Sequence, residues 1–325
     1  MKKIFILSFI SVFILVVSCN QDSGKTDQVK STSNQHPVKK TKGSFNFYII
    51  SDWGWNGFKH QLEVAYGMET FADSVVEPKF IVTCGDNFQI NGVASTQDPL
   101  WITNFENVYN KPSMLVDWYP VLGNHDYHGS PQAEIDYSKI SRRWRLSDHY
   151  YTFARKINDS ISARFIFMDT PPFVEEYRKH PEGYPEITRQ DTAKQLKWLK
   201  EVLSSSKEQW KIVFGHHPVY SASKTHGNTK EMISHVKPLF DKYHVQFYIC
   251  GHDHDLQHLR EKAGGVDYIV TGTGGEPRPD SSNALTIFHK SLPAFSWISL
   301  SADSLQLSFV SSKGDVVYKY VRKYK

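Results

Sequence analysis

Histidines, carboxylates and an asparagine follow short apolar runs at five places in the chain, and each place also contains a glycine. Imidazole nitrogens and carboxylate oxygens are common ligands of transition metals. One His-x-His pair alone would be weak evidence, because loop histidines are often simply solvated. Five such places in one chain predict a site for two metal ions. The polar residues at these places are Asp52, Asp86, Asn124 with His125, His216, and His252 with His254.

The apolar runs that precede these residues predict buried strands. In an open α/β sheet, ligands bind outside the carboxyl ends of the strands, so we expect the polar residues to meet there. Cys84 and Cys250 end two of the runs, and we interpret both as small buried hydrophobic residues. The runs are Phe47–Ile50, Phe80–Cys84, Tyr119–Leu122, Trp210–Phe214 and Phe247–Cys250.

Asp86 is the natural bridge between two ions, because one carboxylate can hold two cations. Asp52 and His254 would complete the first ion, M1, and a second group of residues would complete the other ion, M2. This nitrogen and oxygen ligand set suits Zn, Mn or Fe. A water held between the ions would lose a proton near neutral pH and act as the nucleophile, a metal-bound hydroxide. The expected M2 ligands besides Asp86 are Asn124, His216 and His252.

Two further histidines are candidates for catalysis. Asn124 is neutral, so the two ions would keep a net positive charge and attract a phosphate. His125, which follows Asn124, would contact that phosphate or protonate the leaving oxygen, although it could instead only fix its loop. His226 lies in a Gly/Ser/Thr-rich loop and either reaches the same pocket or is solvated. We treat the other candidates as solvated or structural, namely His217, His149, His180, His235 and His289.

The composition is that of a globular protein. The chain has 325 residues, of which 40% are apolar and 14% aromatic, so it can bury a core. Its net charge of +4 is mild and its basic residues are spread out, so we expect no nucleic-acid partner. Three cysteines are too few for a disulfide framework.

The N-terminus predicts export. A basic start precedes an apolar stretch over residues 4–17, and small residues lead to Cys19, as in a bacterial lipoprotein signal. We therefore expect residues 1–19 to be a signal peptide and Cys19 to be acylated, with ordinary secretory cleavage as the alternative. Residues 20–44 are polar and predict a flexible linker. The protein would then be membrane-anchored, in the periplasm or at the cell surface.

Residues 45–325 predict one catalytic domain. Apolar spacing indicates helices over residues 64–75, 98–109 and 132–144, and Thr188 and Asp191 resemble the start of another. Residues 170–189 lack any period and predict a long loop that could act as a lid or specificity loop. Residues 295–320 alternate with period two, as in antiparallel strands. Alternating strands and helices followed by strands predict a layered α/β sandwich.

The motifs resemble those of the calcineurin-like metallophosphoesterases, and more narrowly the small purple acid phosphatases of the mammalian tartrate-resistant type. The resemblance covers the chain from about Phe45 onward. It implies a four-layer α/β/β/α sandwich and hydrolysis of phosphate monoesters by two metal ions. It also implies the M1 and M2 ligands named above and a phosphate contact by His125. His226 matches a second such histidine only if one residue is inserted before it. The motifs are Asp52-Trp-Gly, Gly85-Asp-Asn-Phe, Gly123-Asn-His-Asp, Gly215-His-His-Pro and Gly251-His-Asp-His.

The chain departs from that family at M1. In the purple enzymes a tyrosine three residues after the bridging aspartate binds the ferric ion, and here Gln89 takes its place. Other members have a histidine where this chain has Gly54. Gln89 could supply a carbonyl oxygen to the metal, or a water could fill the gap. Because neither stabilises Fe(III) as a phenolate does, we expect a colourless protein with divalent Fe, Mn or Zn and a weaker M1.

We weigh three functions. The first is a lipid-anchored, monomeric, acid-phosphatase-like phosphomonoesterase acting on a phosphate-ester substrate. The second is a phosphodiesterase or nucleotide hydrolase, in which the 170–189 loop and three aromatic residues could stack a base. The third is a non-catalytic surface binding lipoprotein with a degenerate M1. The aromatic residues are Trp53, Trp55 and Phe88, for which core or rim packing is the alternative.

Overall fold

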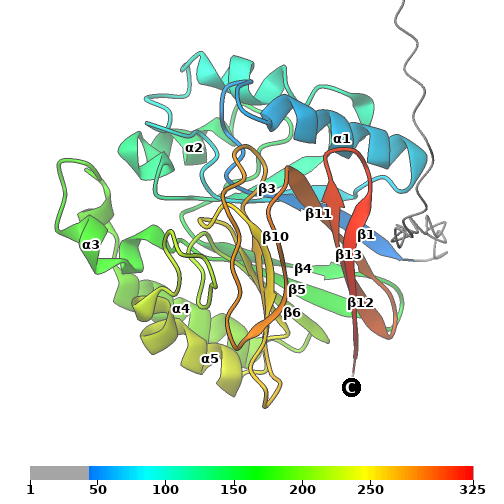
Figure 1. The fold of residues 1–325 in the computed structure, drawn as a ribbon. Helices are drawn as coiled ribbons and strands as arrows, with labels where there is room; N and C mark the ends of the chain where they lie inside the picture. The colour runs from blue at the N-terminus through cyan, green and yellow to red at the C-terminus, as the bar shows by residue number, and fades with distance from the viewer. Residues whose placement is uncertain (1–43, 325) are drawn as a thin grey trace, which may run out of the picture. The chain divides into compact units, whose positions relative to one another are not determined.

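Two mixed β-sheets form the centre of the computed structural model, which describes residues 44–324 (Figure 1). The first sheet has six strands in the order β13-β12-β11-β1-β2-β3. The second has seven strands in the order β10-β8-β9-β7-β6-β5-β4. The first six in chain order are β1 (Phe45–Ile50), β2 (Phe80–Cys84), β3 (Asp117–Val121), β4 (Tyr151–Lys156), β5 (Ser162–Phe167) and β6 (Trp210–Phe214). The rest are β7 (Phe247–Cys250), β8 (Leu256–Leu259), β9 (Asp267–Thr271), β10 (Thr286–Lys290), β11 (Ala294–Leu300), β12 (Ser304–Ser311) and β13 (Val316–Lys323).

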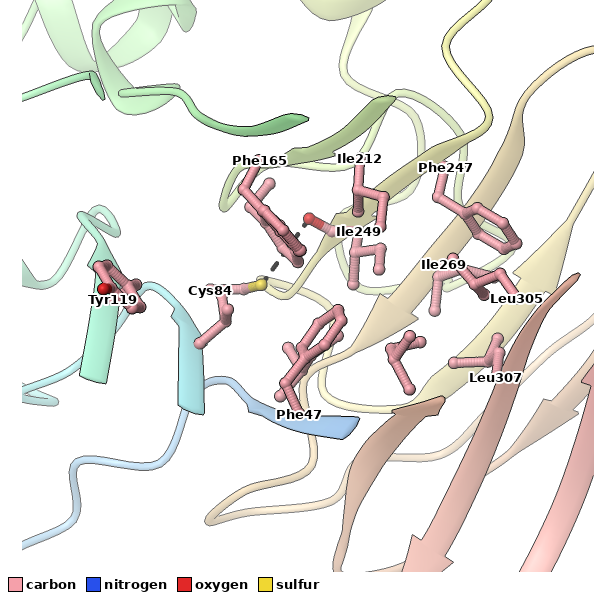
Figure 2. Close-up of a cluster of buried hydrophobic side chains, with 14 of the residues drawn as sticks. Phe47, Cys84, Tyr119, Phe165, Ile212, Phe247, Ile249, Ile269, Leu305 and Leu307 are labelled. Carbon is pink, nitrogen blue, oxygen red and sulfur yellow. Dashed lines mark hydrogen bonds between the residues drawn. The ribbon is translucent and has the colours of Figure 1, made fainter. Parts of the chain in front are cut away.

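The main hydrophobic core lies between the two sheets (Figure 2). Alternate residues of each strand point to opposite faces, so Phe47 of β1 points into this core and meets Phe165 of β5 edge-on at 5.5 Å between ring centroids. The Cys84 thiol is also buried there and donates to the Ile249 carbonyl across the sheets at 3.7 Å. Cys84 and Cys250 are both buried, as expected.

Helices cover the outer face of the first sheet (Figure 1). The predicted helix over residues 64–75 is confirmed as α1 (Gln61–Ser74), and its Phe71 packs on Phe295 of β11 at 5.7 Å. The helix expected over residues 98–109 is shorter in the structure, where only η1 (Trp101–Glu106), a π-helix, is formed. α2 (Pro131–Tyr137) completes this layer.

The helix expected over residues 132–144 ends at Tyr137, so that prediction was seven residues too long. Beyond it the backbone extends to bond with β3: the Trp118 amide donates to the Arg143 carbonyl at 2.6 Å. The Arg143 side chain turns inward and pairs with Glu106 at 3.0 Å. The spacing of apolar residues in the sequence does not reveal these long-range contacts.

A second helical layer covers the outer face of the second sheet. It contains α4 (Thr192–Ser205), η6 (Met232–Val236) and α5 (Lys237–Lys242). Leu199 and Phe240 pack there with Val213 and Tyr248 from the sheet. The four-layer α/β/β/α sandwich is therefore confirmed. The start of α4 is capped by Asp191, whose carboxylate accepts from the Lys194 amide at 3.0 Å, while Thr188 lies outside the helix.

The remaining segments are less regular. The 170–189 loop contains three short helices, η4 (Pro171–Phe173), α3 (Glu175–Arg178) and η5 (Ile187–Arg189). Two further short turns are η2 (Pro112–Met114) and η3 (Asp126–His128). The predicted signal peptide, the acylation of Cys19 and nearly all of the predicted linker lie outside the described residues. Within residues 44–324, no helix has the length and apolar character needed to cross a membrane.

Candidate metal centre

The structure brings the six predicted metal ligands together from both sheets. Asp52, Asp86 and Asn124 follow β1, β2 and β3, which are parallel neighbours. His216 follows β6, and the His252–His254 pair follows β7, its parallel neighbour in the other sheet. Parallel strands end at one edge of a sheet, and the two sheets present these edges to each other.

His216 occupies the middle of the group. Its Nε2 lies 3.5 Å from Asp86 Oδ1, 3.0 Å from Asn124 Oδ1 and 3.2 Å from His252 Nδ1. The ring is fully buried. Four ligand-type atoms from four strand ends therefore converge, which is the arrangement expected for M2.

Asp52 and His254 form the other half of the group, with 3.4 Å between Oδ1 and Nε2. Asp52 Oδ2 accepts from the His252 amide at 3.0 Å, but Oδ1 is buried without a hydrogen-bond partner among the described residues. A buried unpaired carboxylate oxygen is costly unless a cation balances it. Asp52, Asp86 and His216 also offer ligand atoms within 4.8 Å of one another.

The hydrogen bonds of two histidines fix their tautomers for metal binding. His216 Nδ1 lies 2.8 Å from the Cys84 carbonyl, and His254 Nδ1 lies 2.8 Å from the Glu276 carbonyl. A carbonyl only accepts, so each Nδ1 must carry the proton. The Nε2 lone pairs then face the centre, as in metal-bound histidines. The residues present fit two cations.

Strained backbone marks the same positions. Asp52, Asp86 and His252 have φ values of 55°, 50° and 69°, in the left-handed region that non-glycine residues rarely adopt. Gly85 has φ +90°, and a Cβ there would lie 2.5 Å from His216 Nδ1. The tight turn after β2 therefore needs glycine, and the left-handed turns aim the ligands inward.

The electrostatics favour ligand states of these groups. Burial, with the charges of His217 and His216, holds the pKa of His252 well below its usual value, so its imidazole is neutral. Burial alone would raise the pKa of Asp52, but the nearby imidazoles of His254 and His216 hold it below its usual value, so the carboxylate is ionised. A neutral imidazole and an ionised carboxylate are the forms that bind cations.

Gln89 lies beside the central carboxylate. Its side chain is buried, and its Nε2 donates to Asp86 Oδ2 at 3.3 Å. The structure therefore places this residue at the centre, in contact with the carboxylate predicted to bridge both ions. The same amide carries an oxygen that could serve as a ligand, so a role as ligand stays a prediction.

His125 lies at the open side of the group. Its amide donates to Asp86 Oδ1 at 3.0 Å, and its ring Nδ1 lies 3.3 Å from the Ile90 carbonyl. Nε2 therefore faces the centre, 4.0 Å from Asp86 Oδ2, and the side chain is 32% exposed. This position suits a group that exchanges protons with a substrate.

A cavity of about 410 Å³ adjoins the centre. His226 lines it, with its ring centroid 4.1 Å from that of His252. His217, treated from the sequence as solvated or structural, is buried in the cavity wall, where its Nε2 lies 3.1 Å from the Tyr177 hydroxyl. Tyr177 belongs to the 170–189 loop, so that loop does border the site. The adjacent predicted ligand, His216, is the sequence feature that could have pointed to His217.

Asp126 belongs to the motif that starts at Gly123, but no role was predicted for it. This buried carboxylate accepts from the amides of Gly123 at 2.7 Å, Phe88 at 3.0 Å and Asn87 at 3.2 Å. It therefore ties the loop after β2 to the loop after β3. The adjacent Asn124 and Asp86 depend on this tie for their positions.

The aromatic residues proposed to stack a base do not form one surface. Trp53 and Phe88 are 0% and 1% exposed and pack with Trp101, Phe105 and other rings. These two residues therefore take the alternative of core packing and cannot stack a base, because neighbouring rings bury them. Only Trp55 is partly exposed.

Known proteins match this chain over most of its length. The calcineurin-like phosphoesterase family matches residues 45–256. Purple acid phosphatase 17 of Arabidopsis thaliana is 32% identical, over 87% of this chain and 85% of the relative. The human tartrate-resistant acid phosphatase type 5 is 31% identical, over 85% and 90%.

Two solved structures share the fold. One is described as "GAP50 the anchor in the inner membrane complex of Plasmodium"; it has a TM-score of 0.77 and 27% identity, over 87% of this chain and 89% of its own. The purple acid phosphatase PPD1 of yellow lupin has a TM-score of 0.63 and 14% identity, over 86% and 53%, and supports the fold alone. The chain therefore belongs to the calcineurin-like phosphoesterase family, as a dinuclear-metal phosphoesterase related to the purple acid phosphatases.

Proposed function

We propose that this phosphoesterase hydrolyses phosphate monoesters. The observation that carries the proposal is the convergence of the six predicted ligands around Asp86 and His216, with His125 beside them. Relatives named purple and tartrate-resistant acid phosphatases support a monoester substrate. An anionic phosphate would bind at the open side, between His125 and the cavity.

Asp52, Asp86 and His254 would hold M1, and Asp86, Asn124, His216 and His252 would hold M2. Bound there, two divalent cations would polarise the phosphoryl oxygens and activate a water for attack. Because the donors are nitrogen and oxygen and Gln89 is neutral, divalent Mn, Zn or Fe suits the site. Gln89 would support M1 through its amide oxygen or by holding Asp86.

His125 would protonate the leaving oxygen. Its Nδ1 donates to the Ile90 carbonyl, so a second proton on Nε2 faces the substrate side. His226 would contact the phosphate from the opposite wall, since its ring neighbours that of His252. General acid catalysis by a positioned histidine contributes about 10²–10⁴-fold.

The test uses the full chain in detergent, stripped of metal and reloaded with Mn, Zn or Fe. Hydrolysis of 4-nitrophenyl phosphate is compared with that of bis(4-nitrophenyl) phosphate and of a nucleotide. Asn124→Ala should lower kcat by at least about 100-fold, because a ligand is lost. Asn110→Ala, at an exposed position, should not change it. If the protein prefers either of the other substrates, it is a diesterase or nucleotide hydrolase and the monoesterase proposal is wrong.

A second candidate function is binding without catalysis. The similarity to the Plasmodium protein described as an anchor favours it, together with Gln89 at M1. Metal content separates the two candidates. Two ions per chain with turnover support the enzyme, whereas one ion without turnover supports the binding protein.

We also propose that residues 1–19 are a signal peptide and that acylated Cys19 anchors residues 45–325 through the 20–44 linker. The sequence pattern alone supports this. Mass spectrometry of the membrane fraction should find an acylated N-terminal cysteine, and Cys19→Ser should release the protein. Release of the unchanged protein without detergent would contradict the anchor.

A further inference from the structure

Arg278 lies beside the candidate metal centre, on the segment that joins β9 to β10, and the site described above does not use it. Its amide donates to the His254 carbonyl at 2.7 Å. In return, His254 Nδ1 donates to the carbonyl of Glu276, two residues earlier, at 2.8 Å. These two bonds place Arg278 next to a predicted M1 ligand, 24 residues further along the chain.

The segment that carries Arg278 is firmly held. The Gly274 amide donates to the Ser51 carbonyl at 3.0 Å, and the His60 amide donates to the Gly275 carbonyl at 2.9 Å. A Cβ on Gly275 would lie 1.9 Å from Cδ1 of Trp55, so glycine permits this close approach. Arg278 is therefore presented from a fixed backbone.

Its guanidinium is poorly paired. Arg278 Nη2 lies 3.7 Å from Glu276 Oε2, whereas Lys59 Nζ lies 2.5 Å from the other oxygen of the same carboxylate. Two cations thus share one anion and leave one positive charge in excess. Among the described residues, the guanidinium has no recorded hydrogen bond, and the side chain is 34% exposed.

Arg278 is placed at the edge of the candidate metal centre by its bond to His254, a predicted M1 ligand. From there its long side chain can reach a group that extends from a phosphate at the centre. Arginine presents a planar fork that binds phosphate or carboxylate through two parallel hydrogen bonds.

We propose that Arg278 is a specificity-determining residue that binds a second anionic group, a phosphate or carboxylate, on the leaving group of the substrate. This inference rests on the proposed phosphomonoesterase function. It places the scissile phosphate at the metal centre and the second anion on the Glu276–Arg278 segment. The favoured substrates are then monoesters of phosphorylated or carboxylated alcohols.

The test compares three esters with one ring: phenyl phosphate, 4-carboxyphenyl phosphate and 1,4-phenylene bisphosphate. The metal-loaded full chain should prefer the latter two by kcat/KM. Arg278→Gln should reduce that preference about tenfold, mainly through KM, because a charge-assisted pair is lost. Arg278→Lys should retain part of it. Arg142→Gln, at an exposed position outside the cavity, is the matched control. The two anionic esters tell whether phosphate or carboxylate is the better ligand.

Binding without turnover gives an independent measurement. Calorimetry with phenylphosphonate and 4-carboxyphenylphosphonate should show the same Arg278-dependent preference. An equal preference in the parent and Arg278→Gln proteins would overturn the assignment. If no ester is hydrolysed but the phosphonate preference depends on Arg278, the proposed function fails and the anion site stands.

Discussion

At the scale of single residues, we expect Gln89 to determine which metal M1 binds. It contacts Asp86 Oδ2 through a neutral amide at 3.3 Å, where the purple enzymes are expected to offer a phenolate. We predict that the iron-loaded protein is colourless and that Gln89→Tyr gives a visible charge-transfer band. Gln89→Phe has the same ring without the hydroxyl and should stay colourless. Identical absorption spectra of the Tyr and Phe variants would contradict this account of M1.

Asp126 supports the same site by joining the loops that follow β2 and β3. Asp126→Ala would leave the buried amides of Gly123, Phe88 and Asn87 without their acceptor. We expect the free energy of unfolding to fall by about 3 kcal/mol, measured by urea denaturation of the metal-free protein. Asp136→Ala removes an exposed carboxylate and should change it by less than about 0.5 kcal/mol. Equal midpoints for the two variants would refute this role.

The ligands and their supports differ in how far sequence reveals them. Asp52 and His254 each follow an apolar run directly, so the local pattern predicts their place at a strand end. Asp126 accepts from the amides of Asn87 and Phe88. Arg278 binds the carbonyl of His254 from the segment between β9 and β10. These partners are distant in sequence and adjacent only in the fold. No local periodicity reports such a contact.

At the scale of elements, the N-terminus of α4 tests whether the sequence identifies the residue that caps a helix. Asp191→Ala should cost about 1 kcal/mol of stability, because the Lys194 amide loses its cap. Thr188 resembled the first residue of a capping box but lies in η5, so Thr188→Ala should cost less than about 0.5 kcal/mol. Denaturant titration of both variants checks the difference, and the reverse order would place the cap at Thr188.

Strands were easier to predict than helices. β2, β6 and β7 match their expected ranges, because short apolar runs between polar turns admit few other structures. The helix predicted to reach Trp144 stopped at Tyr137 because Arg143 turns inward to Glu106 and its carbonyl pairs with β3. Helix length thus depended on tertiary contacts, which apolar spacing does not encode.

At the scale of the whole molecule, the order of the strands in the sheets could not be predicted from the sequence. Alternating strands and helices indicated a layered α/β fold, and the family resemblance indicated four layers. The position of β11 beside β1, which joins the C-terminal strands to the first sheet, depends on antiparallel pairing across some 250 residues, such as Phe45 with Leu300. Only the assembled core between the sheets fixes that partner.

The metal centre should also stabilise the whole domain, because its predicted ligands come from both sheets. Asp52, Asp86 and Asn124 belong to one sheet edge and the histidines to the other, so bound cations would cross-link them. Removing the metals should lower Tm by about 5 °C or more, since a ligand at 100 times its Kd contributes about 2.7 kcal/mol. Asn124→Ala should show a smaller loss, and Asn110→Ala the full loss. If chelation leaves the Tm of the parent unchanged and reloading does not raise it, the cations do not join the sheets.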